Sequence, residues 1–330
     1  MALTLKERSQ FVLAFARVLF VDGQSTAHTV AAAERLAGIL DLRAQLLVRW
    51  GELQLVAEDG DATLVCATEA DPAGVDMTRV TSAMRALDDL DAGRLTPSAA
   101  IERVGSISQA PPGPTWLFAL AAGAGAAALS VIFGVQHLPA AALIFFSAAG
   151  GGVLRRSLAP LSANVFLQPF CAALLAGVIG ALAVRYELSS SLRLVAVCPC
   201  MVLVPGPHLL NGAMDLIEAR IHLGATRLIY AGVVLVAIAV GLLIGLALLG
   251  VSLPVGPPGR TVPLWEDIIA AGVAVAAYSV FFNTPLYMLP APVAVGMVAH
   301  AIRWGALVVL GASAAIGAMV ACVIVGLIIT

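Results

Sequence analysis

The chain has 330 residues, of which 60% are hydrophobic and 12% are charged, and its formal net charge at pH 7 is −2. Soluble domains carry about 25% charged residues, so this composition and a mean hydropathy of +0.98 exclude a single water-soluble core. Lys6 is the only lysine, which excludes the clustered basic surface that a nucleic-acid partner would need.

The distribution of charge predicts a soluble domain at residues 1–110. Fifteen of the 20 acidic residues and ten of the 18 basic residues lie before residue 110. The periodicity there predicts, in chain order, a helix at 5–22, a second helix from the Gly23–Thr26 turn to about Leu40, strands at 46–50, 53–56 and 63–67, and helices at 76–90 and 96–107. This is a small α+β domain, expected to be cytoplasmic because no export signal precedes it. Residues 108–114 are expected to form a linker.

Apolar segments dominate the rest of the chain. Crossing the hydrocarbon core of a bilayer takes about 20 apolar residues. Eight candidate spans follow the linker, at 115–135, 138–154, 165–184, 193–207, 227–250, 265–283, 288–303 and 306–329. The expected fold class is therefore an α-helical polytopic membrane protein with an N-terminal α+β domain, about eight transmembrane helices and the lipid bilayer as its main partner.

An internal repeat is indicated by two similar stretches. Ser130-Val131-Ile132-Phe133 followed by Leu138-Pro139-Ala140 recurs as Ser279-Val280-Phe281-Phe282 followed by Leu289-Pro290-Ala291. The copies are five segments apart, an odd number, so they would cross the membrane in opposite directions, as in many secondary transporters. We therefore expect five helices in a first repeat at 111–254 and three in a partial second repeat at 255–330. Further chain, a companion membrane subunit or a homo-oligomer would complete this 5+5 arrangement.

The segment Pro205-Gly206-Pro207 is the strongest candidate for chemistry. Proline lacks an N–H and crowds the preceding turn, so the helix must break there. Broken helices at membrane depth line cavities and present helix ends to charged substrates. Asn211, Asp215 and Glu218 follow at helical spacing, and the sequence predicts that this segment lies on the substrate pathway. The alternative is a cytoplasmic loop in which the two acids pair with Arg220.

Three other polar residues lie at the ends of apolar segments. Asn164 and Asn283 either line the pathway or cap helices. His300 either relays protons or bonds a neighbouring side chain. Among the cysteines, Cys198 and Cys200 flank a proline with no further cysteine or histidine at a zinc-like spacing, so we expect neither a metal nor another cofactor. No catalytic motif and no phosphate-binding loop is present, which predicts transport by an ion gradient rather than an enzyme.

The motifs in order resemble those of the threonine/serine exporter (ThrE) family. The resemblance rests on Leu203-Val-Pro-Gly206 with Asn211, Asp215 and Arg227, on Gly23-Gln-Ser-Thr26 before Glu34-Arg35, on Asp91-Ala-Gly93-Arg-Leu-Thr96, on Asn164, and on Phe281-Phe-Asn-Thr-Pro285. Two departures are visible. His28-Thr29-Val30-Ala31 stands where the family often has an acid, and the family's second Pro-Gly segment is expected beyond Thr330.

The resemblance implies a cytoplasmic domain and about ten membrane helices, sometimes divided between two subunits, in the bacterial inner membrane. It implies export of small hydroxy-amino acids, driven by the proton gradient. We therefore expect a small polar substrate, threonine or serine first, with Glu218, Arg227 and His300 as coupling or charge partners. One alternative is export of a small dicarboxylate such as succinate, for which Arg227 would matter more than Asp215. Another is a non-transporting membrane subunit of a two-component exporter.

Overall fold

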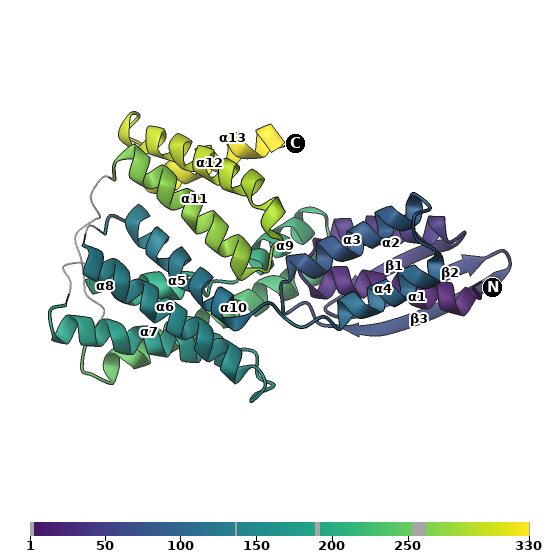
Figure 1. Cartoon of the computed structure of the whole chain (residues 1–330), viewed down its shortest axis with the longest axis horizontal. Helices are drawn as coiled ribbons and strands as arrows, with labels where there is room; N and C mark the ends of the chain where they lie inside the picture. Colours follow the sequence, from purple (N-terminus) through teal and green to yellow (C-terminus); the bar gives the residue numbers. More distant parts are fainter. Residues whose placement is uncertain (1–2, 136, 189–191, 253–261, 330) are drawn as a thin grey trace. The chain divides into compact units, whose positions relative to one another are not determined.

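The computed structural model describes residues 3–135, 137–188, 192–252 and 262–329. Its elements in chain order are α1 Leu5–Val21, α2 Thr26–Ile39, β1 Arg43–Arg49, β2 Gly51–Asp59, β3 Ala62–Ala70, α3 Met77–Asp91, α4 Pro97–Ser108, α5 Thr115–Ile132, α6 Leu138–Leu158, α7 Leu167–Arg185, α8 Leu192–Met201, α9 Gly206–Ile217, α10 Ile221–Ala247, α11 Leu264–Phe281, the 3-10 helix η1 Leu286–Met288, α12 Pro290–Val308 and α13 Ala314–Ile329. Figure 1 shows their arrangement.

Two compact units make up the chain. The first comprises Met1–Pro112 together with Pro205–Gly232, and the second comprises Gly113–Val204 together with Val233–Thr330. The first unit therefore contains the N-terminal elements α1 to α4 and also α9 with the first half of α10. This assignment brings a stretch from the middle of the sequence into the same compact body as the N-terminal domain.

The N-terminal part of the first unit confirms the expected helices and strands. The sheet is antiparallel in the order β1-β2-β3, joined by two tight turns in which Gly51 and Gly60 have positive φ. Burial alternates along β2, with Leu53, Leu55 and Ala57 inside, as the period of two predicts.

Helix α1 is the centre of this part of the structure. It contacts β2 and β3 on one side and α2, α3 and α4 on the others, and Figure 1 shows these elements side by side. Its buried residues include Val12, Phe15, Leu19 and Phe20, all at most 1% exposed. Thr4 and Glu7 form a capping box that fixes its first turn. The apolar face read from the sequence is therefore the face around which the domain is built.

The eight apolar segments of the sequence are all helical, but the expected number of eight spans is not confirmed. Six described helices are long and apolar enough to cross a membrane: α5, α6, α7, α10, α11 and α12. The broken pair Arg193–Met201 and Gly206–Ile217 would make a seventh if it forms one span. Helix α13 is apolar but shorter. The discrepancy arises because proline ends one segment early and the last described helix is too short.

In the second unit, small residues allow close packing of the helices. Helix α5 packs against α6 and α11, and the rings of Phe118 and Phe281 stack with their centroids 4.3 Å apart (Figure 1 shows α5 beside α11). Between α7 and α10 the approach is closer still, because a Cβ atom on Gly177, Gly241 or Gly245 would overlap backbone atoms of the opposite helix. Such contact is typical of membrane helices, in which small residues let backbones meet.

The two stretches of the suggested repeat end their helices in the same way. In the first, Phe133 N–H donates to Leu129 O, and Gly134 has φ 90°. In the second, Phe282 N–H donates to Tyr278 O, and Asn283 has φ 55°. Glycine and asparagine are the residues that best tolerate this left-handed position after a helix. The backbone is therefore similar at the C-terminal ends of α5 and α11. The inverted repeat of five segments stays a prediction.

Replacing Gly245 by alanine should destabilise the second unit. The added methyl group would meet the Leu174 carbonyl oxygen on α7, and overpacking of this kind costs about 1–3 kcal/mol. We expect a lower melting temperature of the purified protein in detergent. Gly232→Ala is the matched control, since a Cβ there meets nothing within 4 Å and the helix is the same. Equal melting temperatures for the two variants would contradict the close packing of α7 and α10.

Candidate functional site: the α9–α10 corner

The helix break lies where the sequence predicts it. Helix α8 ends at Met201 and α9 begins at Gly206, with Pro207 in its first turn. Pro205 has φ −78° and ψ 63°, and no side chain caps the start of α9. Because Pro205 and Pro207 provide no N–H, α8 cannot continue unbroken into α9, whose first described backbone bonds run from His208 N–H and Leu209 N–H to Pro205 O. The break therefore delivers a helix N-terminus next to a polar segment.

Helix α9 buries its polar face and exposes its apolar face. His208, Asn211 and Asp215 are buried, whereas Leu210 is 63% exposed and Ile217 is 84% exposed. A water-facing helix would have the opposite arrangement. The pattern is typical of a helix whose outer side meets lipid and whose inner side serves a polar purpose.

Two buried side chains of α9 bond backbone carbonyl groups of the N-terminal elements. Asn211 Nδ2 donates to Gly23 O at 3.3 Å, and His208 Nε2 donates to Pro72 O at 2.9 Å. The imidazole of His208 also lies against Trp50 and Tyr230, with ring centroids 6.5 and 5.0 Å away. Carbonyl oxygen accepts only, so His208 carries its proton on Nε2. These contacts hold the polar face of α9 to the loops after α1 and β3.

An ion pair closes the corner between α9 and α10. Arg227 Nε lies 3.0 Å from Asp215 Oδ2, and both side chains are 2% exposed. The contact is ionic rather than an aligned hydrogen bond, since neither atom meets the geometry of one. Arg220 Nη1 adds a second cation 3.5 Å from Asp215 Oδ1. The buried carboxylate of Asp215 is therefore charge-compensated by two guanidinium groups.

Arg227 also reaches the N-terminal domain. Its Nη2 donates to Thr26 Oγ1 at 3.4 Å, and its guanidinium carbon lies 5.2 Å from the centre of the Phe20 ring. Helices α9 and α10 approach closely enough for this because Gly224 has no side chain, and a Cβ there would lie 2.8 Å from Gly212 O. Arg227 therefore joins α10, α9 and the start of α2 at one point.

The turn that receives these contacts is held from its other side. Gly23 has φ 98°, and Ser25 caps α2 through His28 N–H. Asp22 Oδ1 lies 3.3 Å from Arg79 Nη1, and Asp76 N–H donates to Asp22 O at 3.0 Å. Burial raises the pKa of Asp22 to about 6, with Asp76 acting in the same direction and Arg79 opposing it. The turn is thus fixed between α3 and the α9–α10 corner.

The other residues predicted for the site lie elsewhere. Glu218 ends α9 and is exposed, with Arg220 as its ion-pair partner. Asn164 is exposed, and its Oδ1 accepts from Phe166 N–H at 3.0 Å in the turn before α7, whose first turn has no side-chain cap. Asn283 takes the left-handed position after α11. His300 lies on α12, 3.2 Å from Asp267. The structure thus brings together Asn211, Asp215 and Arg227, whereas Asn164, Asn283 and His300 belong to the second unit.

Two kinds of contact were not predicted from the sequence. Gly23, Thr26 and Pro72 receive the polar groups of the corner. The Gly23–Thr26 motif was noted for its family resemblance, but no local signal marks it or Pro72 as a partner of residues 136 to 201 positions away. Asp267 is 1% exposed and pairs with Arg303 at 2.7 Å. It did have a signal, since an acid kept inside an apolar segment is a functional candidate.

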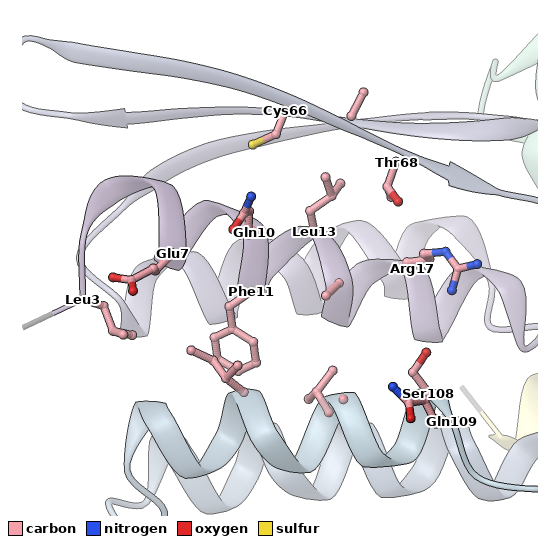
Figure 2. A pocket seen from close by; sticks show the side chains of 15 residues that line it. Leu3, Glu7, Gln10, Phe11, Leu13, Arg17, Cys66, Thr68, Ser108 and Gln109 are labelled. Carbon is pink, nitrogen blue, oxygen red and sulfur yellow. The ribbon is translucent and has the colours of Figure 1, made fainter.

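A groove lies on the N-terminal elements, away from the corner. It has a volume of about 640 Å³ and is lined by α1, β3 and α4. Figure 2 shows Phe11 pointing from α1 toward α4, and Cys66 and Thr68 on the strand above α1. Burial raises the pKa of the Cys66 thiol, which keeps it protonated and weakly nucleophilic. The lining combines an apolar floor with a polar rim and offers no paired nucleophile and base.

In the part of the chain that the structure describes, no group of three or more His, Cys, Asp or Glu side chains is placed to hold a metal ion. The fold and the corner define a multi-pass membrane protein, with six or seven described helices able to span a bilayer and an α+β part that contacts the second helix of the broken pair.

The family follows from the sequence comparison. The chain belongs to the ThrE family, whose description reads "Putative threonine/serine exporter", and the match covers residues 10–249. This range runs from α1 through α10 and includes the whole corner. No curated protein and no solved structure matches the chain. The family is a transporter family, so the chain is a membrane transport protein.

Breaking the buried ion pair should destabilise the first unit. Asp215→Asn leaves Arg227 buried beside a neutral side chain, and losing one partner of such a pair costs about 3–5 kcal/mol. We expect a lower melting temperature and faster proteolysis of the corner. Glu218→Gln serves as the control because Glu218 is exposed. The exchanged pair Asp215→Arg with Arg227→Asp should recover part of the loss, and a swap no better than the single change would argue against a direct pair.

The stability of the first unit should depend on pH through Asp22. In the folded state the pKa is raised from 3.8 to about 6, so between these values the folded protein holds a proton that the unfolded chain has released. The free energy of unfolding therefore falls as pH rises through this window and is unaffected by Asp22 above it. Asp22→Asn should flatten this part of a melting curve recorded from pH 4 to 8. Asp61→Asn, in the β2–β3 turn, should keep the wild-type slope, and a wild-type slope in Asp22→Asn would contradict the assignment.

Proposed function

We propose that the protein is a secondary active exporter of threonine and serine, driven by the proton gradient, in the bacterial inner membrane. Its N-terminal domain would lie in the cytoplasm. The observation that carries this proposal is the family match over residues 10–249, which includes the soluble elements, the broken helix and α10. The described corner adds a physical reason, because it combines a helix N-terminus with buried polar side chains.

A zwitterion needs two opposite partners in its binding site. Its carboxylate is favoured by a helix N-terminus, which carries partial positive charge, and its ammonium group by an acid or by carbonyl oxygens. The start of α9 has no capping side chain, and Asn211 and Asp215 lie one and two turns further along the same helix. A small hydroxy-amino acid would therefore find suitable groups along Pro205, Gly206, Pro207, Asn211 and Asp215. Asn164 and Asn283 are proposed to line other parts of the pathway.

The same polar groups have protein partners in this structure. Asn211 bonds Gly23 O, and Asp215 pairs with Arg227. Substrate passage would then involve exchange of these contacts, since a buried acid cannot lose its cation without a replacement. We propose that the ammonium group of the substrate is that replacement. This makes the Gly23–Thr26 turn a gate on the cytoplasmic side, with Arg227 as its charged contact.

Export of a small dicarboxylate such as succinate is the alternative within transport. Arg227 supports it, because a buried guanidinium is a good carboxylate ligand. Its pairing with Asp215 speaks against it, because the pair presents no net positive charge to a dianion. A non-transporting subunit of a two-component exporter is the alternative outside transport.

Counterflow in vesicles tests these functions. We expect the full chain, reconstituted and loaded with threonine, to take up labelled threonine, and we expect serine but not succinate to compete. Alanine should compete less, because it lacks the hydroxyl group. Competition by succinate alone would favour dicarboxylate export. No counterflow by the single chain, with counterflow restored by a co-expressed small membrane protein, would favour the two-component form.

The pathway assignment can be tested at the corner. At equal amounts of folded protein, Asp215→Asn should lower threonine counterflow about tenfold or more, because the ammonium group loses its counter-charge. Glu218→Gln should leave it close to wild type, since Glu218 lies outside the buried face. Unchanged counterflow in Asp215→Asn would remove Asp215 from the pathway and leave it a purely structural role.

A further inference from the structure

A second buried ionic cluster lies in the membrane half of the molecule, within the second unit. Asp267 in the first turn of α11 is 1% exposed. Arg303 Nη2 on α12 donates to its Oδ1 at 2.7 Å, and His300 Nδ1 lies 3.2 Å from its Oδ2. The two oxygens of one carboxylate therefore serve two different partners, one permanently charged and one that can gain a proton.

Helix geometry explains why these three side chains meet. Asp267, Ala271 and Val275 are four residues apart and share one face of α11, and Gly296, His300 and Arg303 share one face of α12. The faces touch closely, because a Cβ on Gly296 would lie 2.5 Å from a methyl group of Val275. Trp304 Nε1 further donates to Val262 O at 2.8 Å, which ties this end of α12 to the start of α11.

The surroundings of the cluster contribute few other charges. Of the elements packed on α12, α11 supplies Glu266, Asp267 and, three turns further along, Tyr278. The 3-10 helix η1 supplies Tyr287, and α13 supplies Cys322. Helix α5, which packs on the other side of α11, has no titratable side chain within its described bounds. The described contact of His300 is with Asp267, and its side chain is 28% exposed, so it is not sealed inside the cluster.

The charge balance of the cluster suits one exchangeable proton. Asp267 and Arg303 neutralise each other, and neutral His300 donates Nδ1–H to the carboxylate while Nε2 accepts. A proton taken up at Nε2 gives an imidazolium held by the same carboxylate, and its release restores the neutral cluster. Histidine is the side chain whose charge changes near neutral pH. Ionisable groups inside membrane helices characteristically mark such proton relays.

We propose that His300, oriented by Asp267 and Arg303, is the proton-binding group that couples the gradient to export. The inference rests on the proposed function for its physiological meaning, and it names the residue where the driving proton is carried. Arg303 occupies Oδ1 of Asp267, so that Oδ2 is left to orient the imidazole. Asp267 and Arg303 are positioning residues in this scheme.

Proton binding itself can be measured without any substrate. In protein labelled with ¹³C-histidine and purified in detergent, the signal missing from His300→Gln belongs to His300. We expect it to change from the neutral to the protonated position between about pH 5 and 8, and its midpoint to differ in Asp267→Asn. A signal that does not move with pH over this range would overturn the proposal, whatever the transported substrate.

Transport measurements in vesicles then distinguish the coupling role of His300 from the proposed export of threonine. In vesicles with a pH-sensitive dye, wild type should exchange threonine and move protons when a threonine gradient is applied. His300→Gln should keep exchange within about twofold and lose at least tenfold of the proton movement, and His222→Gln, an exposed histidine on α10, should match wild type. Proton movement equal to wild type in His300→Gln would reject the inference and leave the exporter assignment intact. Failure of wild type to exchange threonine would instead reject the substrate assignment, and the titration above still decides whether His300 binds a proton.

Discussion

The ion pair between Asp215 and Arg227 is the constraint around which the first unit is arranged. Both side chains are almost completely buried, and each would be costly to bury alone. Their partnership needs α9 and α10 to meet at a tight corner, which Gly212 and Gly224 permit. It also needs a neighbouring surface that can bond the rest of the guanidinium, and Thr26 and Phe20 supply it. The N-terminal domain and the broken helix are thus connected by electrostatics and not by an apolar contact alone.

The same solution recurs in the second unit with different residues. There, too, a single buried acid is compensated by an arginine from a neighbouring helix, and a glycine lets the helices approach. The difference lies in the partners. Asp215 faces two arginines, which hold their charge at any physiological pH, whereas Asp267 faces one arginine and one histidine. One cluster is therefore suited to holding parts together and the other to responding to protons.

Local patterns in the sequence were sufficient for the N-terminal elements and for the helix break. The strands alternate with a period of two, α1 has a continuous apolar face, and no helix runs unbroken through both Pro205 and Pro207. The start of α10 was wrong by six residues, since His222 to Thr226 look polar enough to be a loop, yet they are helical. That error placed Arg227 at the edge of a segment instead of inside a helix, where it can pair.

What local patterns could not supply was the identity of distant partners. The acceptors for Asn211 and His208 are backbone carbonyl groups, which every residue possesses. The sequence therefore does not identify Gly23 or Pro72 as hydrogen-bond acceptors. The predicted number of eight spans is not confirmed for a related reason, because hydropathy records apolar length and not whether the helix continues. Asp267 is the one buried acid of these clusters that the sequence analysis did not select, although an acid inside an apolar segment is a signal that the sequence itself contains.

The division of the first unit between two stretches of sequence has a consequence for synthesis. Residues 1–112 leave the ribosome long before residues 205–232, which complete the unit, and the chain between them must enter the membrane in the interval. At typical elongation rates the delay is on the order of ten seconds. During that time the carbonyl groups of Gly23 and Pro72 and the hydroxyl of Thr26 await their partners. Completion of the first unit is therefore timed by synthesis of helices α5 to α8, so that the two units reach their final form together.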